Sequence, residues 1–458
     1  MTNRDVLLCA LTGFAALTAD AISSNEENAA KLPKETVEAK TARMKWWTDA
    51  RFGMFIHFGL YAMPARHEWV KSYEHLTNED YEKYFELFNP DHLDARAWAK
   101  AAKAAGMKYV VLTAKHHEGF CLWDSKVTDY KVTNTPFGRD IVKEFVEAVR
   151  AEGLKVGLYY SLIDWHHPDY TTDWPHPQDA LPPEQKAEFN RGRDMGRYRK
   201  YMHDQITELL SDYGKIDILW YDPQFRDPKK DTKGRDDWNS AELLILTRRL
   251  QPGIIVNNRL DLCEIEGGFD FVTPEQERPD EWPQALGRRQ PWERCQTFSG
   301  SWGYHRDEKT WKSVPQLLDM LIDTVAHGGN LILNVGPTSR GDFDGRALDR
   351  LDGIRKWMYA NGRSIYGCTQ APDEYLGGKP EKNPLGCWMT WNPETRRLYL
   401  HIMHSYPEDG LLKVDFLDRI RYAQFLHDGS ELQLKDGAIE LPKDRPNVAV
   451  PVVECLMK

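Results

Sequence analysis

Polar and charged residues end a series of short apolar runs in this 458-residue chain. The runs are rich in Ile, Val, Leu, Phe and Tyr, as expected for buried strands. Because a carboxylate is costly to bury unless it is paired or hydrogen-bonded, such endings indicate a built polar site. The residues that end these runs are His57, Lys115, His116, His117, Tyr160, Ser161, Asp222, Arg259, Glu275, Glu293 and Asn334.

This set favours carbohydrate chemistry. Two carboxylates, Asp222 with Glu275 or Glu293, accompany several histidines, one arginine and many aromatic residues. In glycoside hydrolysis one carboxylate attacks the anomeric carbon while the other protonates the leaving oxygen, and aromatic faces stack on the sugar. Each residue alone has a plainer explanation; Asp222, for example, precedes Pro223 and could simply shape a turn. The joint occurrence at strand ends is what indicates a site.

Other reaction classes lack their motifs. The sequence contains no H-x-H or H-E-x-x-H metal spacing, no G-x-S-x-G elbow and no phosphate loop. The adjacent His116 and His117 are expected to point to opposite faces of a strand, which disfavours a shared metal. We therefore predict no metal and no cofactor.

Composition limits the partners. The net charge of -10 and the absence of a basic block argue against a nucleic-acid partner. Beyond Cys9 the six cysteines are scattered without C-x-x-C spacing, so neither a zinc site nor a dense disulfide framework is indicated.

The N-terminus has the pattern of an export signal. Arg4 precedes an apolar run that extends to about Ala19, and Ala19-Asp20-Ala21 forms a small-x-small cleavage pattern. Residues 1–21 are predicted to be a signal peptide and residues 22–43 a linker or N-terminal extension. The signal peptide predicts a periplasmic or secreted protein. The apolar run is too short for a membrane span, and no other segment qualifies.

Strand and helix patterns alternate over residues 44–367. Helical periodicity is clear over 139–153, 198–214, 239–253 and 313–329. No G-x-G-x-x-G follows the first strand, which disfavours a doubly wound sheet, and eight strand-like runs predict a (β/α)8-like TIM barrel. In such a barrel the strand ends named above meet on one rim. The strand-like runs cover residues 52–59, 109–115, 155–161, 217–222, 253–259, 269–275, 292–298 and 330–337.

The sequence changes character after residue 367. Short alternating runs separated by Pro, Gly and Asn turns predict a small C-terminal β-sandwich over residues 368–458.

Several blocks within the barrel resemble the α-L-fucosidases of glycoside hydrolase family 29. The matching blocks are "WWTDARFGMFIHFGLYAMPARHEWV", "AKHHEGFCLWDSKVTDYKV", "GLYYSLIDW", "DILWYD", "SWGYHRDE" and "GGNLILNVGPTSRG". They follow one another in the family's order over the whole barrel, whereas the C-terminal region matches only in type.

The resemblance implies roles for individual residues. Asp222, which closes the W-x-D strand, corresponds to the family nucleophile, and Glu275 best matches the general acid/base, with Glu293 and Glu277 as alternatives. The positions that correspond to sugar binding are His57, Glu68, Trp69, His116, His117, Tyr160, Trp220, Arg259 and Trp302.

The resemblance implies a retaining exo-α-L-fucosidase that acts on a fucosylated oligosaccharide or glycoconjugate. Two alternatives stay open: a fucose-binding barrel without catalysis, and a metal-dependent barrel hydrolase that uses His57, His116, His117 and Asp222. Linkage preference, including restriction to α1,3/α1,4-linked fucose, and oligomeric state are also open.

Overall fold

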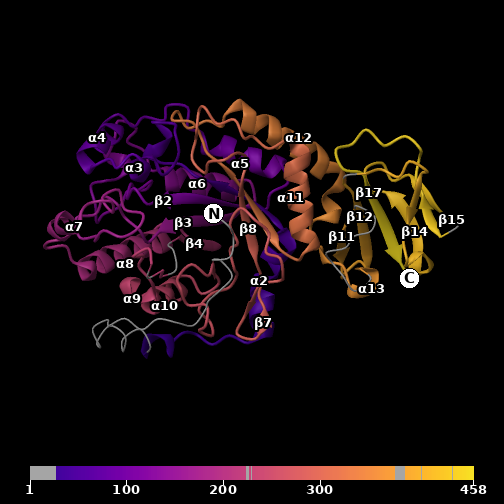
Figure 1. Ribbon diagram of the computed structural model, residues 1–458, viewed down its shortest axis with the longest axis horizontal. Helices are drawn as coiled ribbons and strands as arrows, with labels where there is room; N and C mark the ends of the chain where they lie inside the picture. Colours follow the sequence, from indigo (N-terminus) through magenta and orange to yellow (C-terminus); the bar gives the residue numbers. More distant parts are fainter. Residues whose placement is uncertain (1–26, 223–225, 228, 377–386, 404, 436) are drawn as a thin grey trace.

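The computed structural model describes residues 27–222, 226–227, 229–376, 387–403, 405–435 and 437–458. A parallel barrel is followed by an antiparallel β domain, and α11 (Val314–Ala326) and α12 (Gly345–Asn361) lie between them (Figure 1). The predicted signal peptide, residues 1–21, lies outside the described residues. Within the described part of the chain, no helix has the length and apolar character needed to cross a membrane.

The barrel contains seven hydrogen-bonded parallel strands in the order β5-β4-β3-β2-β1-β9-β8. This curled parallel sheet, covered by helices, confirms the predicted TIM-like domain. The strands are β1 (Phe52–Ile56), β2 (Tyr109–Lys115), β3 (Lys155–Ser161), β4 (Ile218–Asp222), β5 (Ile255–Val256), β8 (Glu293–Thr297) and β9 (Asn330–Val335).

The eighth predicted strand, residues 269–275, forms only isolated bridges. Residue pairs Asn257–Phe271, Val272–Trp292 and Glu275–Cys295 connect this segment to β5 on one side and β8 on the other. Pro274 has no backbone N–H to donate, so it interrupts a continuous ladder. The segment nevertheless closes the barrel between its two edge strands.

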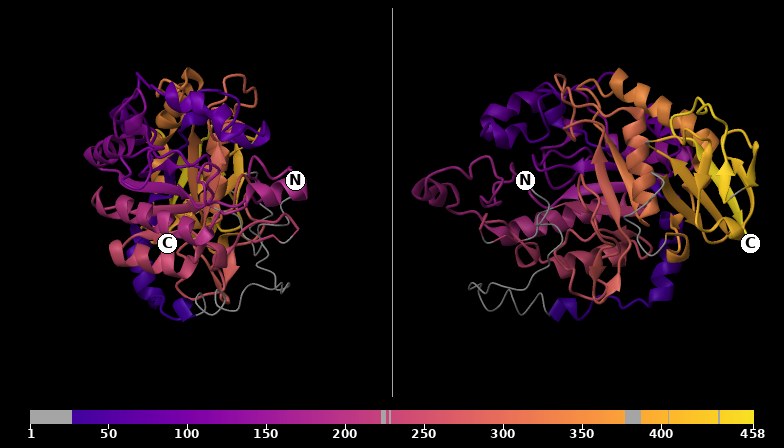
Figure 2. Two further views of the ribbon diagram at one scale, coloured as in Figure 1. Left: turned by 90° about the vertical axis from the view of Figure 1, so that its left-hand side faces the viewer. Right: turned by 45° about the vertical axis from the view of Figure 1, so that its right-hand side comes forward.

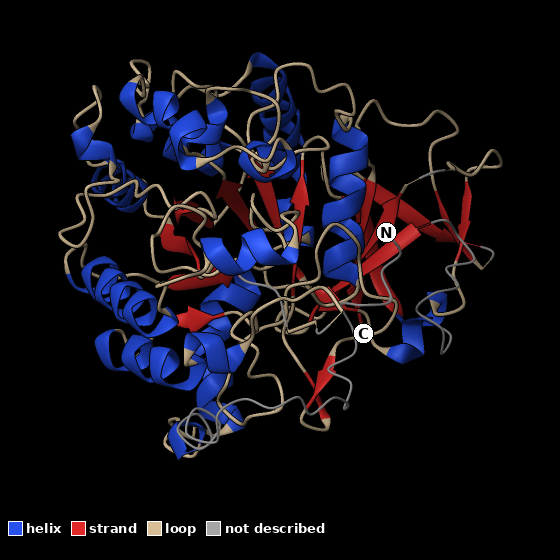
Figure 3. Ribbon diagram, turned by 60° about the vertical axis from the view of Figure 1, so that its left-hand side comes forward, coloured by secondary structure: helices blue, strands red, loops and turns tan. Residues whose placement is uncertain are grey.

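Helices cover the outside of the sheet (Figure 3). The four segments with predicted helical periodicity are α6, α8, α10 and α11. Side-chain caps begin several of them, including Asp140 before α6 and the Ser313–Gln316 capping box of α11. The larger outer helices are α5 (Ala95–Ala104), α6 (Ile141–Ala151), α8 (Met195–Ser211), α10 (Ser240–Leu250), α11 and α12.

Short elements occupy the loops between these helices and strands. They are α3 (Val70–Tyr73), α4 (Asn78–Glu86), α7 (Pro183–Phe189), α9 (Arg235–Trp238), the hairpin β6 (Gln284–Ala285) and β7 (Arg288–Arg289), and the 3-10 turns Leu60–Ala62, Val132–Asn134 and Gly362–Ser364.

Alternation along each barrel strand separates two apolar layers. On β4, Ile218 and Trp220 belong to the cluster inside the barrel, whereas Leu219 and Tyr221 belong to the larger cluster between sheet and helices. Because successive strand residues face opposite sides, Asp222 shares the inward face of Trp220. The strand therefore directs Asp222 into the mouth of the barrel.

Helix α2 (Val37–Ala50) precedes β1 and spans the predicted boundary between the linker or N-terminal extension, residues 22–43, and the barrel domain. The Thr36 side chain caps it, and Arg43 forms ion pairs with Glu35 and Asp270. The local cap and the long-range ion pair with Asp270 stabilise a helix whose own amphipathic pattern is weak.

The C-terminal strands lie together at one end of the molecule, in orange to yellow (Figure 2). They form one antiparallel sheet in the order β10-β11-β12-β17-β14-β15-β16-β13. Strands from both ends of this order contribute to one hydrophobic core, so the sheet curls around it. The predicted antiparallel β domain is confirmed. Its elements are β10 (Thr369–Gln370), α13 (Asp373–Leu376), β11 (Cys387–Asn392), β12 (Arg397–Ile402), β13 (Leu411–Lys413), the 3-10 turn Leu417–Arg419, β14 (Ile420–Phe425), β15 (Glu431–Lys435), β16 (Ala438–Glu440) and β17 (Val452–Met457).

The two domains are joined by specific contacts. Trp388 on β11 donates from Nε1 to Asp319 on α11 at 3.0 Å, and Trp357 on α12 donates to the Val450 carbonyl at 2.9 Å. Trp357 is buried and Trp388 partly buried, so each combines apolar packing with an oriented hydrogen bond across the junction.

Candidate active site

Asp222 lies at the carboxyl end of β4 with 17% of its side chain exposed. Its Oδ1 accepts a hydrogen bond from Arg259 Nη1 at 2.7 Å, and its Oδ2 accepts one from the Tyr159 hydroxyl at 2.7 Å. Donors aimed at both oxygens fix the orientation of the carboxyl group. Asp222 is thus held in place and partly open at the barrel mouth.

Arg259 joins Asp222 to a second carboxylate. Its Nη2 donates to Glu275 Oε2 at 2.8 Å and its Nε to Thr273 Oγ1 at 3.0 Å, while the guanidinium lies 4.6 Å from the centroid of the Trp220 ring. Although burial disfavours the charged form, Asp222 and Glu275 raise the pKa of Arg259 above its ordinary value. The arginine is therefore a fixed cation between the two carboxyl groups.

Glu275 is the more open partner of the pair. Its side chain is 39% exposed, and its backbone bridges to Cys295 on β8. Glu275 is therefore open to solvent and is linked through Arg259 to Asp222. A general acid/base needs such access, because it exchanges protons with substrate and water. Glu277 lies in the following turn, where its backbone N–H donates to the Glu275 carbonyl at 2.7 Å.

Glu293 is not on the rim, contrary to the sequence analysis. It is the first residue of β8 rather than the last, and it is fully buried inside the barrel. It accepts hydrogen bonds from the Tyr109 hydroxyl at 2.5 Å and from Trp220 Nε1 at 3.3 Å, and burial raises its pKa to about 7. This carboxyl supports the floor of the site and does not face the opening.

Replacing Glu293 with Gln is expected to leave most of the catalytic turnover intact. The larger effect should be on stability. A buried Glu with a raised pKa favours the folded state at low pH, and this contribution is lost as the pH rises from the unfolded pKa, 4.5, through about 7. The variant's melting temperature should therefore fall less than that of wild type between pH 5 and 8. If turnover fell as far as it does when Glu275 is replaced with alanine, the assignment of Glu293 to a supporting role beneath the site would be wrong.

Three neutral histidines surround the mouth. Burial lowers the pKa of His57 to about 3, that of His117 to about 3, and that of His116 well below its usual value. A neutral imidazole has one donor and one acceptor nitrogen. These side chains are therefore suited to bind sugar hydroxyls without adding charge.

The hydrogen bonds of His117 and His57 define their tautomers. Ser161 donates its hydroxyl to the Ile163 carbonyl, so His117 Nδ1 donates to Ser161 Oγ at 2.7 Å, and the acceptor Nε2 lies 3.7 Å from Asp222 Oδ2. Asn334 donates to the Trp302 carbonyl, so its oxygen accepts from His57 Nδ1 at 2.6 Å. Each histidine keeps its Nε2 as a hydrogen-bond acceptor.

His116 and His117 lie together rather than on opposite faces. Their ring centroids are 4.1 Å apart, and the His116 ring stacks 5.7 Å from Tyr159. Strand β2 ends at Lys115, and its register with β3 shifts between Thr113 and Lys115. The simple alternation rule therefore no longer applies to the pair. His116 Nδ1 is buried and has no hydrogen-bond partner among the described residues.

Tyr160 is outside the site, which corrects the sequence assignment. Its hydroxyl donates to Gln205 on α8 at 2.7 Å, in the layer between sheet and helices. In the register of β3 with β4, Tyr159 pairs with Trp220 and Tyr160 with Tyr221. Tyr159 therefore faces inward and contacts Asp222. Trp220 and Asp222 are two residues apart and so share one face of β4, which indicates that one of the two tyrosines on β3 faces the same side. The sequence does not reveal which one, because it does not give the register between the two strands.

Tyr159 and Tyr160 form a matched pair for mutation. Tyr159→Phe should lower kcat by roughly 10- to 100-fold, the scale of a hydrogen bond to a charged group. Tyr160→Phe should leave kcat unchanged and cost only about 1 kcal/mol of stability through the lost Gln205 contact. Steady-state kinetics and thermal melts on both variants check this. Equal kinetic losses would show that the inward assignment is wrong.

Glu68, Trp69 and Trp302 form one side of the mouth. Glu68 Oε2 accepts from the backbone N–H groups of Trp302 at 3.0 Å and Gly303 at 2.9 Å, and from Ser301 Oγ at 3.0 Å. It thereby positions the Trp302 ring, whose centroid is 5.1 Å from that of His57. The Trp69 ring lies 5.6 Å from His117.

Most of the predicted residues meet at this mouth. Trp220 forms its floor beneath Arg259 and touches Tyr159, with ring centroids 5.8 Å apart. The sequence analysis missed Tyr159 and Thr273, which contact Asp222 and Arg259. The described residues contain no group of three or more His, Cys, Asp or Glu that could hold a metal ion, so the metal-site alternative finds no ligand set there.

Comparisons with known proteins identify the family of this chain. The family model for α-L-fucosidase matches residues 19–363. A tissue α-L-fucosidase of Rattus norvegicus is 30% identical over 394 residues, covering 81% of this chain and 78% of the relative. The plasma α-L-fucosidase of Homo sapiens is 30% identical over 393 residues, covering 78% of each.

Solved structures extend the likeness to the fold. α-L-Fucosidase isoenzyme 1 from Paenibacillus thiaminolyticus superposes with a TM-score of 0.83 at 42% identity, covering 92% of this chain and 99% of its own. A family 29 enzyme from Bacteroides thetaiotaomicron, trapped as a covalent intermediate with 2-fluoro-fucosyl fluoride, gives 0.76 at 29% identity over 91% of this chain and 96% of its own. The chain therefore belongs to the α-L-fucosidases of glycoside hydrolase family 29.

Proposed function

We propose that this chain is a retaining exo-α-L-fucosidase in which Asp222 is the nucleophile and Glu275 the general acid/base. The observation that carries the proposal is the Arg259 guanidinium, which donates to both carboxylates. Carboxylates bridged by one guanidinium are close together. Retaining pairs lie roughly 5–5.5 Å apart, whereas inverting pairs leave a wider gap for water.

In the first step Asp222 attacks the anomeric carbon of the bound fucosyl residue, and Glu275 gives its proton to the leaving oxygen. The bond between that carbon and the leaving oxygen breaks, and a fucosyl ester of Asp222 forms. Arg259 and the Tyr159 hydroxyl each donate to one oxygen of the attacking carboxylate and orient it. Trp220 and the other buried aromatic rings hold this pair on a rigid floor.

In the second step Glu275 removes a proton from water, which attacks the same carbon and releases Asp222. The change of role has an electrostatic cause. Esterification removes the negative charge of Asp222, so Glu275 becomes the only carboxylate of the pair that can form an ion pair with Arg259. This ion pair stabilises the ionised form of Glu275, which acts as the base. Two inversions at one carbon give net retention.

Terminal α-L-fucosyl groups of oligosaccharides or glycoconjugates are the proposed substrates. The acceptor nitrogens of His57 and His117 suit sugar hydroxyls, and Trp69 and Trp302 supply apolar faces. The N-terminal signal pattern supports export to the periplasm or the medium. The preference for α1,3/α1,4 or other linkages is to be read from a panel of oligosaccharides that differ only in linkage.

The configuration of the first product tests the proposal. Proton NMR of an aryl α-L-fucoside mixed with the enzyme should show α-L-fucose appearing first, followed by slow mutarotation to the β anomer. If β-L-fucose appeared first, the paired roles of Asp222 and Glu275 would be wrong. If no fucose were released from any substrate, the proposal of a catalytic function would be wrong.

A further inference from the structure

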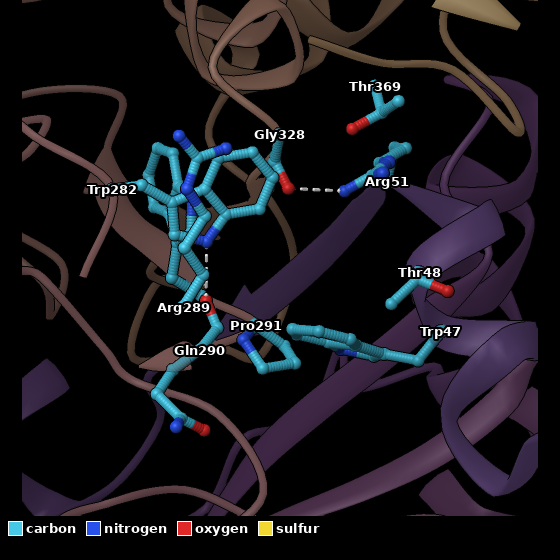
Figure 4. Close-up of a pocket in the computed structure, with 10 residues that line it drawn as sticks. Trp47, Thr48, Arg51, Trp282, Arg289, Gln290, Pro291, Gly328 and Thr369 are labelled. Atoms are coloured by element: carbon cyan, nitrogen blue, oxygen red, sulfur yellow. Dashed lines mark hydrogen bonds between the residues drawn. The ribbon is translucent and has the colours of Figure 1, made fainter. Parts of the chain in front are cut away.

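A second pocket lies at the opposite end of the barrel from Asp222. It has a volume of about 260 Å³. Three of its lining residues lie just before the amino ends of strands: Arg51 precedes β1, Trp292 precedes β8 and Gly328 precedes β9. Because the strands are parallel, this end is remote from the catalytic mouth. The lining residues on which the argument rests are Trp47, Arg51, Trp282, Arg289, Pro291 and Gly328 (Figure 4).

Arg51 is a buried cation without an acidic partner. It is 8% exposed and donates to the carbonyl oxygens of Cys368 at 2.6 Å and Gly328 at 2.7 Å, both neutral acceptors. Among the described residues no carboxylate pairs with it, whereas Arg294, buried to the same extent, has Asp323 at 3.6 Å. Burial lowers the pKa of Arg51 to about 10. A buried charge without a counter-charge is costly.

The backbone of Arg51 adds to this cost. It ends α2 in the left-handed conformation, with φ of 59°, where glycine is the usual residue. Both the burial and the backbone conformation of this position therefore disfavour an arginine. A role for its guanidinium in the pocket would explain this choice of residue.

A second guanidinium stands on the other side of the pocket. Arg289 stacks 5.1 Å from the centroid of Trp282, and within the described chain no acidic side chain pairs with it. Gly328, at φ of +81°, lets Trp282 lie against the backbone, because a Cβ there would come within 2.1 Å of the ring. Figure 4 shows Arg51 and Arg289 on either side of Gly328, with Trp47 and Pro291 as an apolar floor.

We propose that this pocket binds a single sugar ring that carries one anionic group, a carboxylate or a sulfate. Two guanidiniums and no acidic side chain line it, so charge complementarity favours an anion. The indole and proline walls suit the apolar face of a ring. Its volume lies just below the roughly 300–1,000 Å³ of ordinary ligand sites, which fits one ring rather than a chain.

The pocket's role is independent of the roles of Asp222 and Glu275, so binding can be measured without turnover. Calorimetric titrations of the full chain, with L-fucose present to fill the catalytic site, would use D-glucuronate and D-galactose 6-sulfate. Neutral D-glucose and inorganic sulfate serve as references. Saturable one-to-one binding of at least one anionic sugar, tighter than either reference, is expected. The two anionic sugars distinguish a carboxylate ligand from a sulfate ligand.

Arg289→Ala should weaken that binding at least tenfold and leave aryl fucoside hydrolysis unchanged. Arg288→Ala is the matched control, because Arg288 lies on the same hairpin and pairs with Glu266. It should bind as wild type does. No binding of either anionic sugar, or equal binding by the Arg289 and Arg288 variants, would overturn the proposal; Arg51 would then serve only to join the carbonyls around it.

Discussion

Replacing Asp222 with glycine is expected to lower turnover of an aryl α-L-fucoside by roughly 10⁴-fold or more, the scale on which catalytic nucleophiles act. The substitution removes the atom that attacks the anomeric carbon and leaves a space on that face of the sugar. Arg259 keeps Glu275 as a partner, so the mouth of the barrel should stay assembled.

Azide provides the diagnostic readout for the Asp222 variant. It should enter the space and attack the substrate directly, giving β-L-fucosyl azide by a single inversion. A thermal melt close to that of wild type shows that the loss is chemical rather than structural. Wild-type turnover, or a complete lack of azide rescue in a folded variant, would count against Asp222 as the nucleophile.

Replacing Glu275 with alanine is expected to produce a loss that depends on the leaving group. Substrates whose leaving group needs a proton should slow by about 10²- to 10⁴-fold, the usual contribution of a general acid. Activated dinitrophenyl fucosides need no proton and should still form the fucosyl ester, which then accumulates because no base activates water. The limb of the pH–rate profile that reports the acid should disappear.

Azide again discriminates between the two carboxylates. In the Glu275 variant it should attack the ester of Asp222 and release α-L-fucosyl azide, the anomer opposite to that expected from the Asp222 variant. Glu277→Ala, two residues along in the same turn, is the matched control and should behave as wild type does. If the leaving-group dependence appeared in the Glu277 variant instead, the acid/base assignment would move to that residue.

The depth of Glu293 shows why a sequence match alone does not assign the acid. The sequence places it at an apolar run beside a tryptophan, where it resembles a rim carboxylate. In the barrel that run begins at Glu293, so the residue enters at the lower end of β8 and lies under Trp220. A proton donor must reach the glycosidic oxygen. Burial beneath the floor prevents this.

Local sequence determined much of the protein. The periods of apolar residues revealed the helices and strands, because burial of one face imposes a period of 3.6 or 2. Placing Asp222 after an apolar strand was enough to put it on the functional rim, since parallel strands all end at the same side of a barrel. Glu275 followed from the same rule although its segment forms bridges rather than a strand.

Only the tertiary structure decided which neighbours meet. The choice between Tyr159 and Tyr160 depends on the register of β3 against β4, and the clustering of His116 with His117 depends on where β2 ends. The bridge from Asp222 through Arg259 to Glu275 joins three separate segments. Such contacts arise from packing between distant parts of the chain, and a period read along one segment carries no information about them.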